Sequence, residues 1–323
     1  MKWLSLFVSA IVCGQESSIF KVTAPLVLVP ATVNDAKGRT IEGLTEFDFV
    51  VLDNGVPQRP SLEYTLSPIS MVLVIEANYR SGAVLRKIQK IGSIIQPLVL
   101  GERGAAAVLT FADEVRVWQD FTSRPEVLGS CLKKLEPQGG GVVLHDAVAK
   151  AVEMLAERND RARRRVVIVV SESKDHGSKT KLADLVTRAQ SANVIVYPLT
   201  FSAYATAFTS KGAETFSSGA PVYDADHGGL KEIFGELGAL GKENSHEAFA
   251  KFTGGEQLHF AKLDGLERVI AKVGEDLHSQ YLLSFTPANA PPAGGFHKLE
   301  VRVKDRPEVL VRTRPGYWPT SGN

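Results

Sequence analysis

The chain has little cysteine, and after its N-terminus it has no apolar segment long enough to span a membrane. Of its 323 residues, only Cys13 and Cys131 are cysteines. If the segment that contains Cys13 is removed on export, Cys131 is alone and cannot form an internal disulfide. The helical spacing around Cys131 predicts a buried, apolar role for it. An exported chain of this kind must be stabilised by its hydrophobic core, and 323 residues can bury one.

Excess charge of either sign is also absent. The chain has 37 Lys and Arg against 36 Asp and Glu, for a net charge of +1. This balance gives no general reason to expect binding to nucleic acid or to an anionic membrane. The apolar fraction of 44% and the charged fraction of 23% are typical of an ordinary globular protein.

Catalytic motifs are scarce. No two of the seven histidines have the i, i+4 spacing with an intervening Glu that zinc hydrolases use, and no serine lies in a G-x-S-x-G elbow. The run Gly139–Gly141 lacks the Lys-Ser/Thr of a nucleotide-binding loop. We therefore expect no enzyme. One alternative stays open, a hydrolase that uses a cluster of His145, Glu172, Asp175 and His176.

The N-terminus predicts export. Met1-Lys2 is a short positive region, and Trp3–Val12 is apolar but too short to span a bilayer. We expect residues 1–14 to be a signal peptide cleaved near Gly14, which places the chain outside the cell or in the periplasm. The alternative is a lipid anchor at Cys13.

From residue 69 to residue 282, strand and helix patterns alternate, which predicts a doubly wound α/β domain with a mostly parallel, Rossmann-like sheet. Apolar, β-branched runs predict its strands, and apolar residues at helical spacing predict its helices. The segment 201–247 interrupts this pattern as a long insertion. The expected strands are Val72–Ile75, Ala105–Phe111, Val115–Trp118, Val166–Val170, Val194–Leu199 and Leu258–Phe260; the main expected helices are Val84–Leu98, Leu144–Leu155, Leu182–Ala189 and Leu263–His278.

The two ends of the chain, residues 15–68 and 283–323, read as strands separated by turn residues such as Asp53-Asn54-Gly55. Each end has too few strands to close a core alone. We expect the two ends to pair in one small β-sandwich-like unit, because insertion of one domain into another brings the flanking segments together.

Three motifs occur in order along nearly the whole chain. Val33–Gly55 matches "V-x-D-x-x-G-x-x-V-x-G-L-x-x-x-D-F-x-V-x-x-D-G" at most positions. Ser279–Pro287 matches "S-Q-Y-L-L-x-Y-x-P", and Arg314–Tyr317 matches "R-x-G-Y". With these motifs the chain resembles a von Willebrand factor type A domain, in the variant common in secreted proteins of acidobacteria.

The resemblance implies a metal-ion-dependent adhesion site at the ends of the strands, where open α/β sheets bind ligands. That site uses D-x-S-x-S, a threonine and a later aspartate as oxygen ligands for a divalent ion. This chain departs from the pattern at every position, with Glu76, Asn78, Arg80, Val142 and Glu172 in their places. Valine offers no ligand, and a fixed arginine repels a divalent ion.

We therefore predict a degenerate site without metal or other cofactor, in which Arg80 pairs with Glu76 or Glu172. The predicted function is a secreted, non-catalytic module that binds an unknown protein partner without a metal ion. The candidate contact residues are Glu76, Asn78, Arg80, Val142, Glu172 and Asp175. The alternative is a metal-dependent adhesion domain that holds Mg²⁺, Mn²⁺ or Ca²⁺ weakly through Glu76 and Glu172.

Overall fold

A computed structural model describes residues 26–63, 67–158, 163–172, 174–201, 230–262, 264–287 and 295–319. The expected signal peptide, Cys13 and most of the 201–247 insertion lie outside these residues. No helix in the described ranges is both long and apolar enough to cross a membrane.

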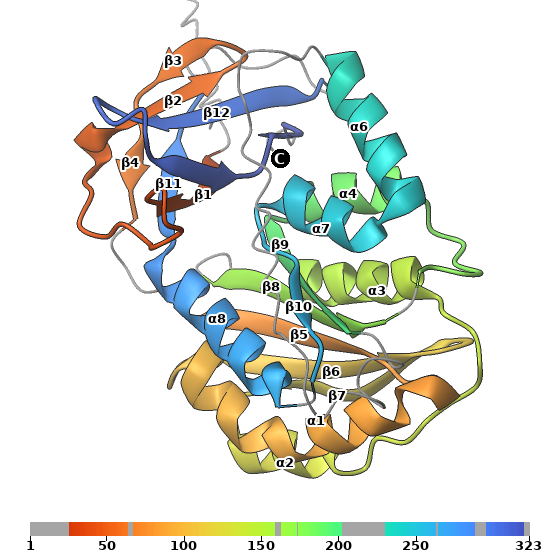
Figure 1. The fold of residues 1–323 in the computed structure, drawn as a ribbon. Helices are drawn as coiled ribbons and strands as arrows, with labels where there is room; N and C mark the ends of the chain where they lie inside the picture. Colours follow the sequence, from red (N-terminus) through yellow and green to blue (C-terminus); the bar gives the residue numbers. More distant parts are fainter. Residues whose placement is uncertain are drawn as a thin grey trace, which may run out of the picture.

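A six-stranded sheet forms the centre of the larger unit (Figure 1). Five strands are parallel, and β7 pairs antiparallel with β6 at one edge, as the sequence predicts. Every residue of β5 is buried because helices cover both faces of the sheet. The strands, in spatial order, are β10 (Leu258–Phe260), β9 (Val194–Phe201), β8 (Arg164–Ser171), β5 (Ile69–Glu76), β6 (Ala105–Phe111) and β7 (Val115–Thr122).

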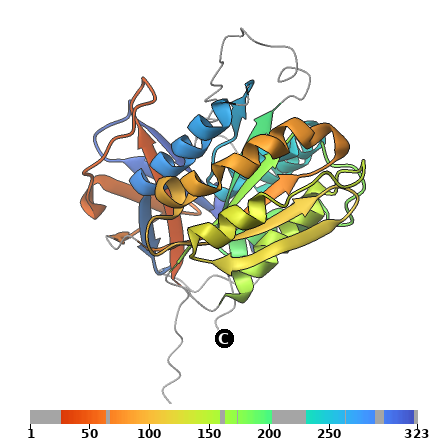
Figure 2. The ribbon, with the colours of Figure 1, turned by 90° about the horizontal axis from the view of Figure 1, so that it is seen from below.

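Two layers of helices enclose the sheet (Figures 1 and 2). Alternate residues of β5 enter different cores: Met71 and Leu73 pack with one layer, and Val72 and Val74 pack with the other. The first layer contains α1 (Gly82–Ile95), η3 (Gln96–Leu100), α2 (Pro125–Leu132) and α8 (Gly265–Ser279). The second contains α3 (Leu144–Glu157), α4 (Leu182–Ser191), α6 (Leu230–Glu243) and α7 (Ser245–Thr253).

The structure corrects two expected boundaries. The helix expected to reach Leu98 ends at Ile95, and a π-helical turn, η3, follows it. Pro97 has no backbone N–H to continue the α-helical ladder, which explains the change. The edge strand extends past Trp118 to Thr122, with irregular register against β6.

Strands from the two ends of the chain form the smaller unit, two four-stranded antiparallel sheets that face each other. In β1, the alternate residues Val27, Val29, Ala31 and Val33 enter the core between the sheets. One sheet contains β13 (Leu310–Thr313), β1 (Val27–Asn34), β11 (Tyr281–Phe285) and β4 (Ser61–Leu62). The other contains β14 (Gly316–Tyr317), β12 (His297–Val303), β2 (Phe49–Asp53) and β3 (Val56–Gln58), with the short turn η1 (Glu46–Asp48) before β2.

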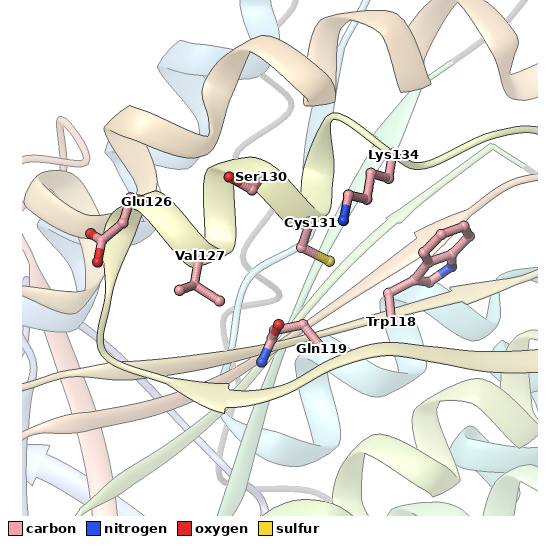
Figure 3. A pocket seen from close by; sticks show the side chains of 7 residues that line it. All are labelled: Trp118, Gln119, Glu126, Val127, Ser130, Cys131 and Lys134. Atoms are coloured by element: carbon pink, nitrogen blue, oxygen red, sulfur yellow. The ribbon is translucent and has the colours of Figure 1, made fainter.

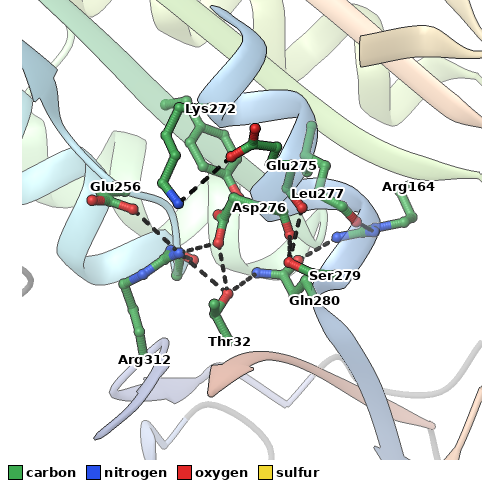
Figure 4. A network of polar contacts seen from close by, with 12 residues as sticks. Thr32, Arg164, Glu256, Lys272, Glu275, Asp276, Leu277, Ser279, Gln280 and Arg312 are labelled. Atoms are coloured by element: carbon green, nitrogen blue, oxygen red, sulfur yellow. Dashed lines mark hydrogen bonds and ion pairs between the residues drawn. The ribbon is translucent and has the colours of Figure 1, made fainter. Parts of the chain in front are cut away.

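A buried polar network joins the two units (Figure 4). Asp276 of α8 accepts hydrogen bonds from Thr32 of β1 (3.0 Å) and Tyr197 of β9 (2.5 Å), and it pairs with Arg312 of β13. Arg312 also lies 3.5 Å from a carboxylate oxygen of Glu256. Burial opposes ionisation of Asp276, but Arg312 and these hydrogen bonds hold the pKa of its carboxyl below the usual value.

The closing motif Arg314–Tyr317 makes further contacts of this kind. The buried Arg314 guanidinium donates to the carbonyl of Gln190 in α4 and to the carbonyl of Leu28 in β1, at 3.1 and 2.6 Å. Gly316 has no room for a side chain, since a Cβ there would lie 2.2 Å from the carbonyl oxygen of His297. The motif thus connects the smaller unit to the helical layer of the larger one.

Candidate functional site

Glu76 is the last residue of β5 and lies at the carboxyl end of the parallel strands. Its side chain is only 1% exposed, because it ends a strand whose seven preceding apolar or small residues are also buried. A buried carboxylate is costly unless hydrogen bonds or a counter-charge compensate the lost hydration. The donors around Glu76 therefore determine what this site can do.

Three neutral groups donate hydrogen bonds to the Glu76 carboxylate. Asn78 donates from its side-chain amide to Oε1 at 2.5 Å. Ser171, at the end of β8, donates from its hydroxyl to Oε2 at 2.6 Å, and the backbone N–H of Glu172 donates to the same oxygen at 2.9 Å. Both carboxylate oxygens are thus hydrogen-bonded.

The orientation of the Asn78 amide follows from its other contacts. Its Oδ1 atom accepts from the backbone N–H groups of Arg80 (3.0 Å) and Ser81 (3.1 Å), and from the Ser81 hydroxyl (3.0 Å). A backbone N–H can only donate, so the atom that faces it must be the amide oxygen. The NH₂ group of Asn78 therefore faces Glu76.

The same contacts hold the 3₁₀ turn η2 (Tyr79–Ser81), which Asn78 caps. The backbone N–H of Tyr79 also donates to the carbonyl of Gly139 at 3.1 Å. The backbone of the turn is fixed in this way, while the side chains of Tyr79 and Arg80 are exposed, that of Tyr79 by 73%. The pairing of the Arg80 guanidinium with Glu76 or Glu172 stays a prediction.

Val142 lies outside this polar network. Its side chain is 1% exposed and packs in the hydrophobic core with Leu144 and Phe249. Its carbonyl accepts from the backbone N–H of His176 at 2.8 Å, so the loop before α3 and the loop after β8 are joined there. A valine in this place contributes to packing and offers no side-chain oxygen.

A glycine loop adjoins the exposed turn. Asp113, just after β6, accepts from the backbone N–H groups of Gly140 (3.3 Å) and Gly141 (2.7 Å). Gly139 has φ +69°, and a Cβ there would lie 1.8 Å from a carboxylate oxygen of Asp113. The close approach of this carboxylate thus requires glycine at position 139.

Asp175 belongs to a second network, beside the start of α3. It accepts from the backbone N–H of His145 at 3.0 Å and from the hydroxyl of Ser178. The His145 ring lies between the Thr180 carbonyl, 3.3 Å from Nδ1, and the Ser245 hydroxyl, 3.0 Å from Nε2. A proton on Nδ1 satisfies the carbonyl and leaves Nε2 to accept from Ser245.

The four residues of the hydrolase alternative are only partly together. His145 and Asp175 are in contact, at 3.7 Å between Nδ1 and Oδ2. The backbone of Glu172 bonds to Glu76, and His176 is exposed with its backbone bridged to Val142. Among the described residues, no three His, Cys, Asp or Glu side chains are grouped closely enough to hold a metal ion.

Sequence reasoning missed Ser81, Asp113, Ser171 and Ser245. Ser171 and Asp113 each follow a buried strand closely, so the rule that pointed to Glu76 could have included them. Ser81 follows Asn78 by three residues, the spacing of a helix cap. Ser245 is 100 residues from His145, and no local signal pointed to it.

A separate hollow of about 310 Å³ lies between β7 and α2 (Figure 3). The ring of Trp118 and the thiol of Cys131 border it, with Glu126 and Lys134 at its rim. Cys131 is buried on α2, as its helical spacing predicts, and burial raises the pKa of its thiol. A thiol of this kind is a poor nucleophile.

Part of the chain matches a known protein family. Residues 80–174 match the family model of the von Willebrand factor type A domain. This segment extends from η2 to the loop after β8 and so includes Arg80, Val142 and Glu172. No curated protein sequence matches the chain.

Solved structures show remote similarity. The BatB protein of Bacteroides thetaiotaomicron is 12% identical, with a TM-score of 0.46 over 65% of this chain and 98% of that one. An aerotolerance-related membrane protein of Bacteroides fragilis is 11% identical, with a TM-score of 0.44 over 64% and 98%. The SpRpn10 VWA domain is 11% identical, with a TM-score of 0.39 over 64% and 93%. No functional conclusion follows from similarity at this level.

Proposed function

We propose that the chain is a non-catalytic protein-interaction module of the von Willebrand A type, which binds its partner without a metal ion. The partner would bind the strand-end face, by which we mean the surface formed by residues 77–81, 112–114, 137–143, 172 and 174–178. This face contains five of the six contact residues predicted from the sequence; the sixth, Glu76, is buried at the end of β5 beneath it.

One observation supports this proposal most strongly. Tyr79 and Arg80 are exposed on a turn whose backbone is held by Asn78 and Gly139. Tyrosine and arginine are enriched among the residues that dominate binding energy at protein interfaces. A fixed backbone also reduces the conformational entropy that is lost on binding.

Metal independence rests on the donors to Glu76. A divalent ion needs oxygen ligands, but the Asn78 side chain and the Glu172 backbone both point N–H groups at the carboxylate. Val142 has no side-chain oxygen that could bind an ion, and its side chain is packed in the hydrophobic core. We also propose that the chain is exported and that it belongs to a family of acidobacterial type. N-terminal sequencing of the mature protein would check the expected cleavage near Gly14.

A capture experiment tests the proposal. The immobilised chain would be exposed to extracts of the source organism in Mg²⁺ and in EDTA, beside the double variant Tyr79→Ala/Arg80→Glu. We expect a partner that the wild type retains in both buffers. The double variant should bind it at least about 30-fold more weakly, since a hot spot contributes about 2 kcal/mol or more.

A control variant changes one exposed aromatic and one exposed basic residue on the smaller unit. Phe47 is 81% exposed and Lys304 is exposed, so Phe47→Ala/Lys304→Glu should leave binding unchanged. Retention in Mg²⁺ but not in EDTA would favour the metal-dependent alternative. Equal retention by the Tyr79/Arg80 variant would place the partner on another surface.

A further inference from the structure

The Asn78 amide lies directly against the Glu76 carboxylate. Its NH₂ group is 2.5 Å from Glu76 Oε1, and its orientation is fixed by the backbone N–H groups of Arg80 and Ser81. The carboxylate thus meets the positive end of an amide dipole that cannot turn without losing those two hydrogen bonds.

We propose that the Asn78 amide is the group that excludes a divalent cation from this site, and that a carboxylate in its place would create a cation site. Replacement of Asn78 by Asp puts an oxygen where the NH₂ group now lies, while the other oxygen can still cap η2. Two carboxylates at such a short distance cannot both stay ionised without a counter-charge.

The surrounding groups are suited to such an ion once the amide is gone. The Ser171 hydroxyl is 2.6 Å from Glu76 Oε2, and a hydroxyl oxygen can turn from donating a hydrogen bond to coordinating an ion. The Ser81 hydroxyl lies 3.0 Å from the Asn78 side-chain oxygen. Ca²⁺ accepts irregular arrangements of oxygen ligands, whereas Mg²⁺ demands near-octahedral geometry, so Ca²⁺ is the better probe.

The experiment compares thermal unfolding and calorimetric Ca²⁺ titrations of the wild type and Asn78→Asp. We expect no saturable heat and no shift of Tm for the wild type. For Asn78→Asp we expect a Kd on the order of 10⁻⁴–10⁻³ M and a rise in Tm of about 3–6 °C in excess Ca²⁺.

Two controls separate a site from a general charge effect. Asn193→Asp makes the same substitution at an exposed residue and should not respond to Ca²⁺. Glu76→Gln/Asn78→Asp removes one of the two facing carboxylates and should lose the response. If Asn78→Asp does not fold alone, refolding in Ca²⁺ and in EDTA replaces the titration, and recovery only in Ca²⁺ supports the proposal.

Two results would overturn it: Ca²⁺ binding by the wild type that Glu76→Gln abolishes, or an Asn78→Asp variant with no gain from Ca²⁺ in either assay. The inference rests on the metal-independent part of the proposed function. This experiment measures only cation binding. If it fails, the capture experiment still decides whether the chain binds a protein partner and through which residues.

Discussion

At the scale of single residues, the main feature of the site is a buried acid stabilised by neutral donors. A hydrogen bond to a charged group contributes about 1.5–3 kcal/mol, so three of them can offset much of the several kcal/mol that burial of Glu76 costs. These hydrogen bonds explain how an acid can stay buried at the strand end.

His246 leads to a prediction about pH. It is 5% exposed on α7, and its Nε2 has no hydrogen-bond partner in the described part of the chain. Burial, with a smaller effect from His145, lowers its pKa from 6.5 to about 4. Below pH 6.5 this histidine binds a proton in the unfolded chain but stays neutral in the folded chain. The free energy of unfolding should therefore fall by about 3 kcal/mol between pH 6.5 and 4.

Chemical denaturation across this pH range measures the effect. The substitution His246→Leu should make the fall in stability shallower by that amount, because leucine does not titrate. His278 is exposed on α8, and His278→Leu should leave the fall as it is in the wild type. A profile for His246→Leu that overlays the wild type would contradict the assignment.

The site was predictable from the sequence only in part. Position along a strand pointed to Glu76, and the type A motif pointed to Asn78, Val142 and Glu172. The direction of the Asn78 amide was not predictable, because it depends on the turn formed by the two residues after it. The donors to Glu76 were missed for a related reason: Ser171 comes from a strand 95 residues away in the sequence.

At the scale of elements, the strand-end face depends on loops that hold one another. Tyr79 bonds to the carbonyl of Gly139, Asp113 bonds to Gly140 and Gly141, and Val142 bonds to His176. Three loops after different strands are thus connected through the segment 139–142. We expect changes in this segment to disturb the exposed turn at Tyr79.

Gly139→Ala tests that expectation. The substitution combines a positive φ with a Cβ that would displace the Asp113 carboxylate from its hydrogen bonds, so we expect a loss of about 1–3 kcal/mol in the free energy of unfolding. Gly140→Ala is the matched control, because a Cβ there meets nothing within 4 Å. Equal stability of the two variants in urea denaturation would show that Asp113 does not hold this loop.

Most elements followed from hydrophobic periodicity, and the boundaries that differ have local causes. Pro97 ended α1 earlier than the apolar pattern suggested. The second half of β7 was not predicted because it contains the polar residues Gln119 and Asp120. An edge strand with a partly exposed face need not be apolar. The sequence predicted strands within residues 15–68 but could not name the partners of β1, which are β11 and β13 from the other end of the chain.

At the scale of the whole molecule, the network around Asp276 couples the two units (Figure 4). Asp276→Asn would leave the buried Arg312 guanidinium without its closest carboxylate, and removal of one partner from a buried ion pair costs about 3–5 kcal/mol. We expect a loss of that size in the free energy of unfolding, measured by urea denaturation.

The neighbouring residue on α8 supplies the control. The Glu275 side chain is 72% exposed, so Glu275→Gln should change stability by no more than about 0.5 kcal/mol. If Asp276→Asn were equally mild, the network would not hold the units together. The smaller unit would then have to be attached through its apolar contacts and through Arg314.

The central claim is that this fold keeps an acid at its strand end but has no place there for an ion. Calorimetric titration of the unaltered chain with Mg²⁺, Mn²⁺ and Ca²⁺ at neutral pH tests it most directly. We predict no saturable binding of any of the three ions. Saturable binding that Glu76→Gln abolishes would contradict the claim and would restore the metal-dependent alternative.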